Sequence, residues 1–302
     1  MTARGPPGER DPAALLRFGV VNLDKPPGPS AHQVAAWVRT LVDDALADLD
    51  PDGPGIEGVA HAGTLDPKVT GSLPLLLGDA TRLVERFRDA PKEYVAVLEL
   101  HRPVPADFEA VLDEFEGELY QKPPRRSAVR RRLRTREVYD LTALETEPRR
   151  ALLRVRCESG TYVRKLCHDV GLALGTGAHM GDLRRVGTGD FDDTDLVTLH
   201  DLADALAFAR EGDDGPLRDA VAPAERLLDG LPTVTVAPNA AREVAEGAPV
   251  YAPGVLDVTG DPTTGETVSV RTPDGAAVCL GTLVGDPDAD AGTVVDLDRV
   301  LV

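Results

Sequence analysis

The sequence has few cysteines and few histidines, and neither set has the spacing of a metal site. Its three cysteines, Cys157, Cys167 and Cys279, are an odd number, and their spacing fits neither a disulfide framework nor a zinc knuckle. We expect them to be small core residues. The six histidines show no paired ligand spacing. The sequence therefore predicts no bound metal.

Long hydrophobic runs are also missing. No stretch approaches the roughly 20 apolar residues that a membrane-spanning helix needs. The first residues, MTARGPPGERDPAALLRFG, carry charges and prolines where a signal peptide would have an apolar run. These absences predict a cytoplasmic protein that does not contact a membrane. With 302 residues, 42% of them hydrophobic, the chain can form one large domain or two ordinary ones.

Positive charge is scarce overall. The chain has 51 Asp and Glu against 33 Lys and Arg, a net charge of −18, and only five of the cations are lysines. Such an acidic composition is typical of proteins from a salt-rich cytoplasm, where a highly charged surface keeps a protein hydrated. The low isoelectric point therefore does not exclude a nucleic acid as partner.

The cations are concentrated in one part of the chain. Residues 121–190 hold sixteen Lys or Arg against eight Asp or Glu, a net of +8, which leaves −26 for the rest. Within them, KPPRRSAVRRRLRTR (122–136) has eight cations and no acid, and seven of the eight are arginines, which pair bidentately with phosphate. The alternative is a solvated basic strand facing the acidic surface. The favoured prediction is an RNA-binding arm that uses Arg125, Arg126, Arg130, Arg131, Arg132 and Arg134.

Hydrophobic periodicity predicts strands and helices in an irregular order. Strands are expected at 18–24, 92–104 and 151–160, and helices at 31–49, 105–119 and 161–175. The apolar stripe of the first helix would consist of Val34, Trp37, Val38, Leu41 and Val42. This order favours an α+β fold over a doubly wound parallel sheet.

The C-terminal part differs in character. Residues 213–232 have the composition of a linker with a short helix, and the segments after 232 are short strands separated by Gly, Pro and Asp turns. That pattern predicts a small, mostly β, barrel-like module. We therefore divide the chain into two domains, residues 1–230 and residues 231–302.

The stretch HAGTLDPKVTG, residues 61–71, raises a question about Asp66. Asp followed by Pro suits the start of a helix, because Asp caps the free amides of the first turn and Pro is well placed at the first helical position. The other interpretation is a carboxylate that takes part in a reaction. The stretch alone does not decide between them.

Four stretches in this order and spacing resemble the TruB family of pseudouridine synthases: NLDKPPGPSAHQVAAWV, HAGTLDPKVTG, KEYVAV and ESGTYVRKLCHDVGLALGTGAHMGDLRR. The resemblance covers nearly the whole chain and includes a C-terminal module similar to a PUA domain, a small RNA-binding barrel. The phrases FGVVNLDKPPGPS, RSAVRRRLRTREVY and GLALGTGAHMGDLRR favour the archaeal and dyskerin-like branch, the catalytic subunits of H/ACA guide ribonucleoproteins. The implied fold is a mixed, mainly antiparallel sheet surrounded by helices.

The resemblance also implies the catalytic residues. Asp66 matches the catalytic aspartate, Tyr94 the tyrosine that stacks on the target base, and Arg164 the arginine that pairs with the aspartate. Isomerising uridine breaks the bond from sugar to base nitrogen and rejoins the base through carbon, and the carboxylate can act as nucleophile or as base. The base must be flipped out of its helix and received on an aromatic face. No redox step occurs, so no cofactor is expected.

Three further residues near the substrate follow from the same resemblance. Lys25, with Pro26, matches a lysine-proline motif that supports the active-site loop. His61 matches a histidine that helps hold the flipped nucleotide, and Leu183 an apolar contact near the base. Taken alone, Lys25 can also serve only to shape a turn, and His61 only to form local hydrogen bonds.

The implied function is the modification of rRNA uridines selected by an H/ACA guide RNA. The partners of that branch are the small Nop and Gar proteins and a kink-turn-binding ribosomal-protein homologue. One alternative is a stand-alone synthase acting on the T-loop of tRNA. Another, from a different class, is a non-enzymatic RNA-binding scaffold, which would not need Asp66, Tyr94 and Arg164 together.

Overall fold

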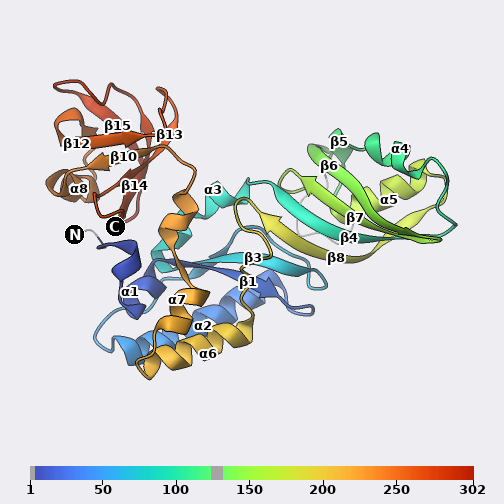
Figure 1. Cartoon of the computed structure of the whole chain (residues 1–302), viewed down its shortest axis with the longest axis horizontal. Helices are drawn as coiled ribbons and strands as arrows, with labels where there is room; N and C mark the ends of the chain where they lie inside the picture. Colours follow the sequence, from blue (N-terminus) through green and yellow to red (C-terminus); the bar gives the residue numbers. More distant parts are fainter. Residues whose placement is uncertain (1–3, 124–131) are drawn as a thin grey trace.

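The computed structural model describes residues 4–123 and 132–302. Within them the strands form two sheets, one of nine strands and one of six, which come from successive parts of the chain. Figure 1 shows the smaller sheet in a module at the C-terminal end, beside the N-terminal helices. None of the helices in the described ranges is long and apolar enough to span a membrane.

The larger sheet has the strand order β5-β6-β7-β4-β8-β3-β1-β9, with β2 paired to β3. Among its described pairs, only β3 and β8 run parallel. The predicted α+β fold with a mixed, mainly antiparallel sheet is confirmed. The strands are β1 (Gly19–Lys25), β2 (Val59–His61), β3 (Thr70–Leu77), β4 (Lys92–Leu100), β5 (Gly117–Gln121), β6 (Arg134–Glu147), β7 (Arg150–Cys157), β8 (Ala178–Thr188) and β9 (Ala222–Pro223).

Helices cover this sheet in two groups (Figure 1). α2 and α6 lie side by side near β1, whereas α4 and α5 lie at the other end of the sheet. The helices are α1 (Pro12–Arg17), α2 (Ala31–Leu49), α3 (Val84–Arg88), α4 (Phe108–Asp113), α5 (Val163–Ala173), α6 (Leu199–Arg210) and α7 (Gly215–Ala220), with short 3-10 turns η1 (Pro7–Glu9), η2 (Gly78–Leu83) and η3 (Ala224–Leu228).

Helix α2 has the predicted bounds, because Ser30 and Gln33 form a capping box at its start. Its buried stripe follows Val34, Val38 and Val42 at four-residue spacing. The prediction that Trp37 belongs to that stripe is wrong, since 49% of its surface is exposed. It lies at the edge of the stripe, where the helix turns toward solvent.

Two other predicted segments differ in the structure. The helix expected over 105–119 is confined to α4, because the chain turns after Asp113 and continues as β5 from Gly117, which has a φ of +92°. The segment 213–232 is not a plain linker. It forms α7, η3 and strand β9, which pairs with β1, and it buries Val221 and Leu228.

The C-terminal module has its own apolar core. Its sheet order is β11-β15-β14-β13-β10-β12, and β10 pairs parallel with β13. The sequence predicted the strands but not helix α8. The elements are β10 (Thr233–Val236), α8 (Pro238–Ala245), β11 (Val250–Tyr251), η4 (Ala252–Gly254), β12 (Val255–Thr259), β13 (Thr267–Arg271), β14 (Ala277–Leu283) and β15 (Thr293–Val300).

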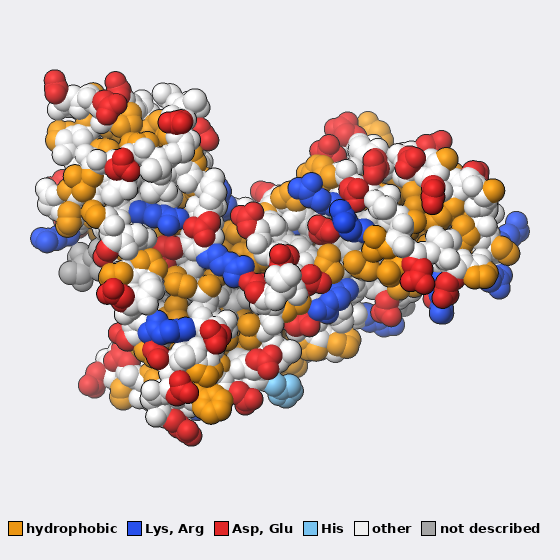
Figure 2. Space-filling view, in the orientation of Figure 1, with side chains coloured by type: hydrophobic (Ala, Val, Ile, Leu, Met, Phe, Trp, Pro, Cys, Tyr) orange, Lys and Arg blue, Asp and Glu red, His pale blue; other side chains and the backbone are white. Residues whose placement is uncertain are grey.

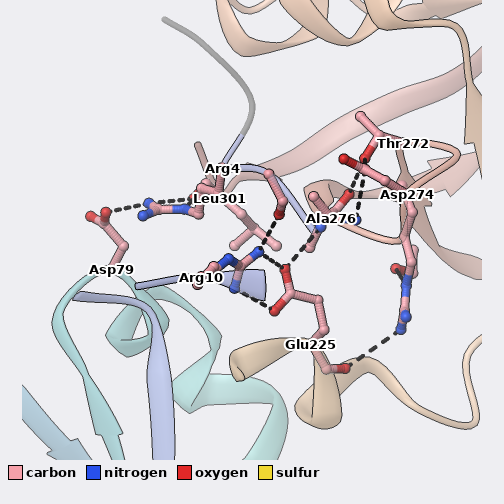
Figure 3. A network of polar contacts seen from close by, with 12 residues as sticks. Arg4, Arg10, Asp79, Glu225, Thr272, Asp274, Ala276 and Leu301 are labelled. Carbon is pink, nitrogen blue, oxygen red and sulfur yellow. Dashed lines mark hydrogen bonds and ion pairs between the residues drawn. The ribbon is translucent and has the colours of Figure 1, made fainter. Parts of the chain in front are cut away.

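A buried ion pair joins the module to the rest of the chain (Figure 3). Arg10 donates to both carboxylate oxygens of Glu225, at 2.8 and 2.6 Å, and the backbone nitrogen of Ala277 donates to the same carboxylate at 3.0 Å. Arg4 adds a bond to the carbonyl of Leu301. A shared apolar cluster, which includes Phe18 and Leu301, packs beneath these bonds. The N-terminal segment therefore fixes the position of the module.

The visible surface (Figure 2) is rich in acidic side chains, as the net charge of −18 predicts. Figure 2 shows acidic side chains spread over the visible face, with fewer Lys and Arg among them. The same view shows a broad hollow between the C-terminal module and the part of the sheet that carries α4 and α5. The predicted arginine arm 122–136 is described only in part, since Arg125, Arg126, Arg130 and Arg131 lie outside the described residues.

Candidate active site

Asp66 lies on the loop that joins β2 to β3. The two strands are antiparallel, with His61 opposite Leu75, so the loop begins and ends at the same edge. The carbonyl of Asp66 accepts a hydrogen bond from the amide of Val69 at 2.9 Å, which closes a turn. No helix begins there, so of the two interpretations of this stretch the helix start at Asp66 is wrong. The turn leaves 51% of the carboxylate side chain exposed.

Lys25 holds this turn from inside. It is the last residue of β1 and is fully buried. Its ammonium group donates to the carbonyls of Pro67 and Val69, at 3.1 and 2.9 Å, and to that of Pro26 at 2.9 Å. Burial lowers the pKa of Lys25. Lys25 therefore supports the loop, and it has no exposed surface with which to contact a substrate.

Arg164 faces Asp66 and forms an ion pair with it. It lies in the first turn of α5, and 42% of its side chain is exposed. The start of α5 is fixed by Gln121, whose side-chain oxygen accepts the amide proton of Tyr162 at 2.9 Å. Two residues 98 positions apart in the sequence are thus brought together at the surface, which leaves both accessible to a third group.

Tyr94 and Leu183 lie beside each other on the large sheet. Tyr94 is on β4, opposite Arg185 of β8, and Leu183 is opposite Ala96 two residues further on. Both side chains therefore belong to one face of the sheet. Only 8% of Tyr94 is exposed, and burial raises the pKa of its hydroxyl. Leu183 is partly buried and packs against the main core.

His61 is the last residue of β2, at the start of the same loop. Its ring lies edge-on to that of His32, with 4.7 Å between the centroids. Burial, together with the neighbouring His32 and Arg185, lowers the pKa of His61 to about 4. Its Nδ1 is buried and has no hydrogen-bond partner within the described part of the chain. The imidazole is therefore neutral near pH 7.

Two buried cations near the loop did not follow from the sequence. Arg185 donates to the carbonyls of Gly63 and Ser72, at 3.2 and 2.7 Å. Lys92 donates to three carbonyls at the end of α3, including that of Ala90 at 2.6 Å, and burial lowers its pKa to about 8. Arg185 follows Arg184 on β8, and neighbouring residues of a strand point to opposite faces of the sheet. The alternation alone does not say which of the two arginines is buried.

The described end of the arginine arm borders this site. Arg134 begins β6 and is paired in register with Gln121 of β5, the residue that fixes the start of α5. Arg132, just before it, is exposed. The arm therefore leaves the sheet close to the helix end that carries Arg164. Residues 124–131 of the arm, which precede Arg132, lie outside the described structure.

The arrangement can perform carboxylate chemistry on a group that approaches from solvent. An ionised Asp66 beside an arginine can act as a nucleophile or as a base, and the nearby aromatic and apolar side chains could contact a flat ring. In residues 4–123 and 132–302, no three His, Cys, Asp or Glu side chains are grouped so that they could hold a metal ion.

Comparisons with known proteins agree with this geometry. Models of four domains match the chain: the N-terminal domain of TruB family pseudouridylate synthases at 54–163, the C-terminal domain of tRNA pseudouridylate synthase B at 164–229, a PUA domain at 232–298 and a DKCLD (NUC011) domain at 4–35. A probable tRNA pseudouridine synthase B of Haloarcula marismortui is 63% identical, covering 100% of this chain and 94% of that protein. One from Halobacterium salinarum is 62% identical over the full length of both.

Two solved structures have the same fold throughout. A chain of a Cbf5-Nop10-Gar1 complex superposes with a TM-score of 0.84 at 42% identity, covering 99% of this chain and 89% of that one. A chain of an H/ACA ribonucleoprotein bound to a substrate RNA containing 2'-deoxyuridine gives 0.85 at 40% identity, with the same coverage. The chain therefore belongs to the TruB family of pseudouridine synthases and ends in a PUA domain.

Proposed function

We propose that this protein isomerises uridine to pseudouridine in rRNA as the catalytic subunit of an H/ACA guide ribonucleoprotein in the cytoplasm. The observation that carries the proposal is the likeness, over 99% of the chain, to chains solved in complexes of that kind. Its partners would be guide and substrate RNA, the small Nop and Gar proteins and a kink-turn-binding protein. Residues 1–230 would form the catalytic domain and 231–302 the module that grips the guide RNA.

In this proposal Asp66 is the catalytic carboxylate and Arg164 the group that orients it. Their ion pair supports these roles, because an opposite charge favours the ionised form that the reaction needs. Tyr94 would receive the base, Leu183 would contact it and His61 would help to hold the nucleotide. Lys25 would act only through the loop, since its ammonium is occupied by three carbonyls.

RNA would reach the site past the arginine arm. Arg134 is paired in register with Gln121, whose side chain binds the start of the helix that carries Arg164, so a strand bound by the arm would pass near Asp66. At about 1 M salt the Debye length is only ~3 Å, so the arm must contact phosphates directly rather than attract RNA from a distance. The predicted role of Arg125, Arg126, Arg130 and Arg131 rests on the sequence alone.

A second candidate is a stand-alone tRNA synthase, which the names of the haloarchaeal relatives favour. The two candidates differ in substrate, not in chemistry. The decisive experiment incubates the purified protein in molar KCl with guide RNA, partners and an rRNA fragment, and in parallel with bare tRNA. Pseudouridine formed in the rRNA only with the guide supports the proposal, and product from bare tRNA alone overturns it.

The same assay tests Asp66. Asp66→Asn should lower the rate of product formation by about 10³-fold or more while RNA binding is retained, because only the carboxylate is lost. Asp48→Asn is a matched control, since Asp48 forms an exposed ion pair with Arg210 on the helical side of the molecule. A fully active Asp66→Asn would refute the catalytic assignment. If wild-type protein bound RNA but formed no product, the scaffold interpretation would replace the enzymatic one.

A further inference from the structure

Arg185 is a buried charge that the proposed reaction does not use. Only 1% of the residue is exposed, and none of the described carboxylates lies within ion-pair distance of its guanidinium. Removing a cation from water is costly unless other polar groups replace the lost hydration. What replaces it here is a pair of backbone oxygens, one from strand β3 and one from the active-site loop.

These oxygens join the active-site loop to the sheet. The Nε atom donates to the carbonyl of Ser72 on β3 at 2.7 Å, and Nη2 donates to the carbonyl of Gly63 at 3.2 Å. Tyr94 is the residue directly opposite Arg185 in the register of β4 and β8, so the two side chains lie on the same face of the sheet. The guanidinium is therefore bonded to the loop three residues before Asp66, and Arg185 lies opposite Tyr94 on the sheet.

The loop is shaped to accept this contact. Gly63 has a φ of +113°, a conformation that other residues rarely adopt. A Cβ atom on Gly63 would lie 3.2 Å from Nη1 of Arg185 and 3.4 Å from Cε of Lys92. The backbone of the loop thus approaches the guanidinium as closely as glycine allows.

We propose that Arg185 is a positioning residue: it sets the Tyr94 side chain and the Asp66 loop at a fixed separation, so that a base received on Tyr94 meets the carboxylate. This inference rests on the proposed function. The guanidinium suits the task because its donors are held in one rigid plane, whereas the ammonium of lysine is a single point on a flexible stem. Arg185 acts through Tyr94 and Gly63 and is not itself assigned a contact with RNA.

The first test is Arg185→Lys, which keeps the charge and most of the volume but loses the planar fork. We expect the single-turnover rate constant of the folded, assembled complex to fall about 10- to 100-fold, because small displacements of reacting groups have effects of that size. The affinity for substrate RNA should stay within about two-fold, since binding is spread over many contacts. A purely structural role would lower the yield of folded protein but not its rate constant.

The second test is a double-mutant cycle with Tyr94→Phe, which removes the hydroxyl and keeps the ring. If Arg185 acts through this hydroxyl, the double variant should be about as slow as the slower single variant, because both remove one interaction. Multiplied rate losses would show that the two residues act separately. Arg150→Lys is the control: it lies on the same sheet in an exposed pair with Glu99 and should keep the wild-type rate.

Each outcome decides the inference. A wild-type rate constant in folded Arg185→Lys overturns it, as do multiplied effects in the cycle. Should Arg185→Lys fail to fold, Tyr94→Phe alone decides: a loss of about 10-fold at unchanged RNA affinity supports the inference, and an unchanged rate overturns it. Failure of the wild-type protein to form pseudouridine in the same assay would instead overturn the proposed function, so the two failures are distinct.

Discussion

Two sets of charged side chains lie around the active-site loop, and they differ in sign, in exposure and in the groups to which they bond. Asp66 and Arg164 have opposite signs, pair with each other and are about half exposed. Lys25, Lys92 and Arg185 are all cations, are buried and bind backbone carbonyls rather than carboxylates. The exposed pair can meet a substrate. The buried cations can only fix the backbone around it, so the site separates accessible charges from charges that hold the backbone.

Breaking the exposed pair should affect rate and not stability. Arg164→Ala is expected to lower the single-turnover rate constant about 10²- to 10³-fold, because it removes a preorganised charge beside the reacting carboxylate. The free energy of unfolding should change by less than about 1 kcal/mol, since exposed ion pairs contribute little. Single-turnover assays and urea denaturation, both in molar KCl, measure the two effects.

Arg210→Ala is the control for this variant. Arg210, on α6, forms a similar exposed pair with Asp48 of α2, and its loss should leave both rate and stability near wild type. An unchanged rate in Arg164→Ala would show that the exposed pair has no catalytic role. A large loss of stability would remove the distinction between the two sets of charges.

Removing a buried cation should, in contrast, first of all lower the free energy of unfolding. Lys25→Met keeps the apolar stem but leaves the carbonyls of Pro67 and Val69 without their donor. We expect a loss of about 2–3 kcal/mol in the free energy of unfolding, because unsatisfied buried acceptors are costly. Activity per folded molecule should also fall, since the turn that presents Asp66 is no longer held.

Lys68→Met tests whether position or charge matters. Lys68 lies on the same loop but is exposed, so its removal should change stability by no more than about 0.5 kcal/mol. Equal losses in Lys25→Met and Lys68→Met would contradict the interpretation that burial, and not the number of lysines on the loop, is what matters.

The sequence predicted the exposed pair better than the buried cations. The helix 31–49, the strands of the C-terminal module and the α+β class follow local patterns, whereas the mixed, mainly antiparallel sheet was implied by the family resemblance; the structure confirms all of them. The pairing of Asp66 with Arg164 was predicted from family motifs, and the two side chains do meet. Their roles in the reaction stay predictions.

Features that depend on distant contacts could not be predicted. The burial of Arg185 depends on the register of β8 against both β4 and β3, which local periodicity does not contain. The exposure of Trp37 depends on which residues pack against α2, and α4 ends in a turn before β5 begins at Gly117 to pair with β6. At Asp66, where Asp-Pro suited a helix start, the chain forms a turn, and the carbonyls of Pro67 and Val69 bind Lys25.

His61 tests whether a buried side chain near the loop can carry a charge without a hydrogen-bond partner, and its expected effect is the smallest. Unlike Arg185, it has a buried nitrogen with no acceptor among the described residues, and its pKa is lowered to about 4 by burial first of all. In the unfolded chain a histidine titrates near 6.5. The unfolded state therefore gains a proton first as pH falls, so the stabilisation is present above about pH 6.5 and is lost toward pH 4.

Wild-type protein should thus lose about 1 kcal/mol more between pH 6 and pH 5 than His61→Gln, measured by urea denaturation in molar KCl. His200→Gln, an exposed control, should keep the wild-type slope. If His61→Gln kept it as well, His61 would be protonated in the folded protein, and a buried cation near the loop would not need a carbonyl acceptor. A flattened slope would show that His61, a buried group without a hydrogen-bond partner, stays neutral in the folded protein, in contrast to Arg185, whose guanidinium is bonded to backbone oxygens.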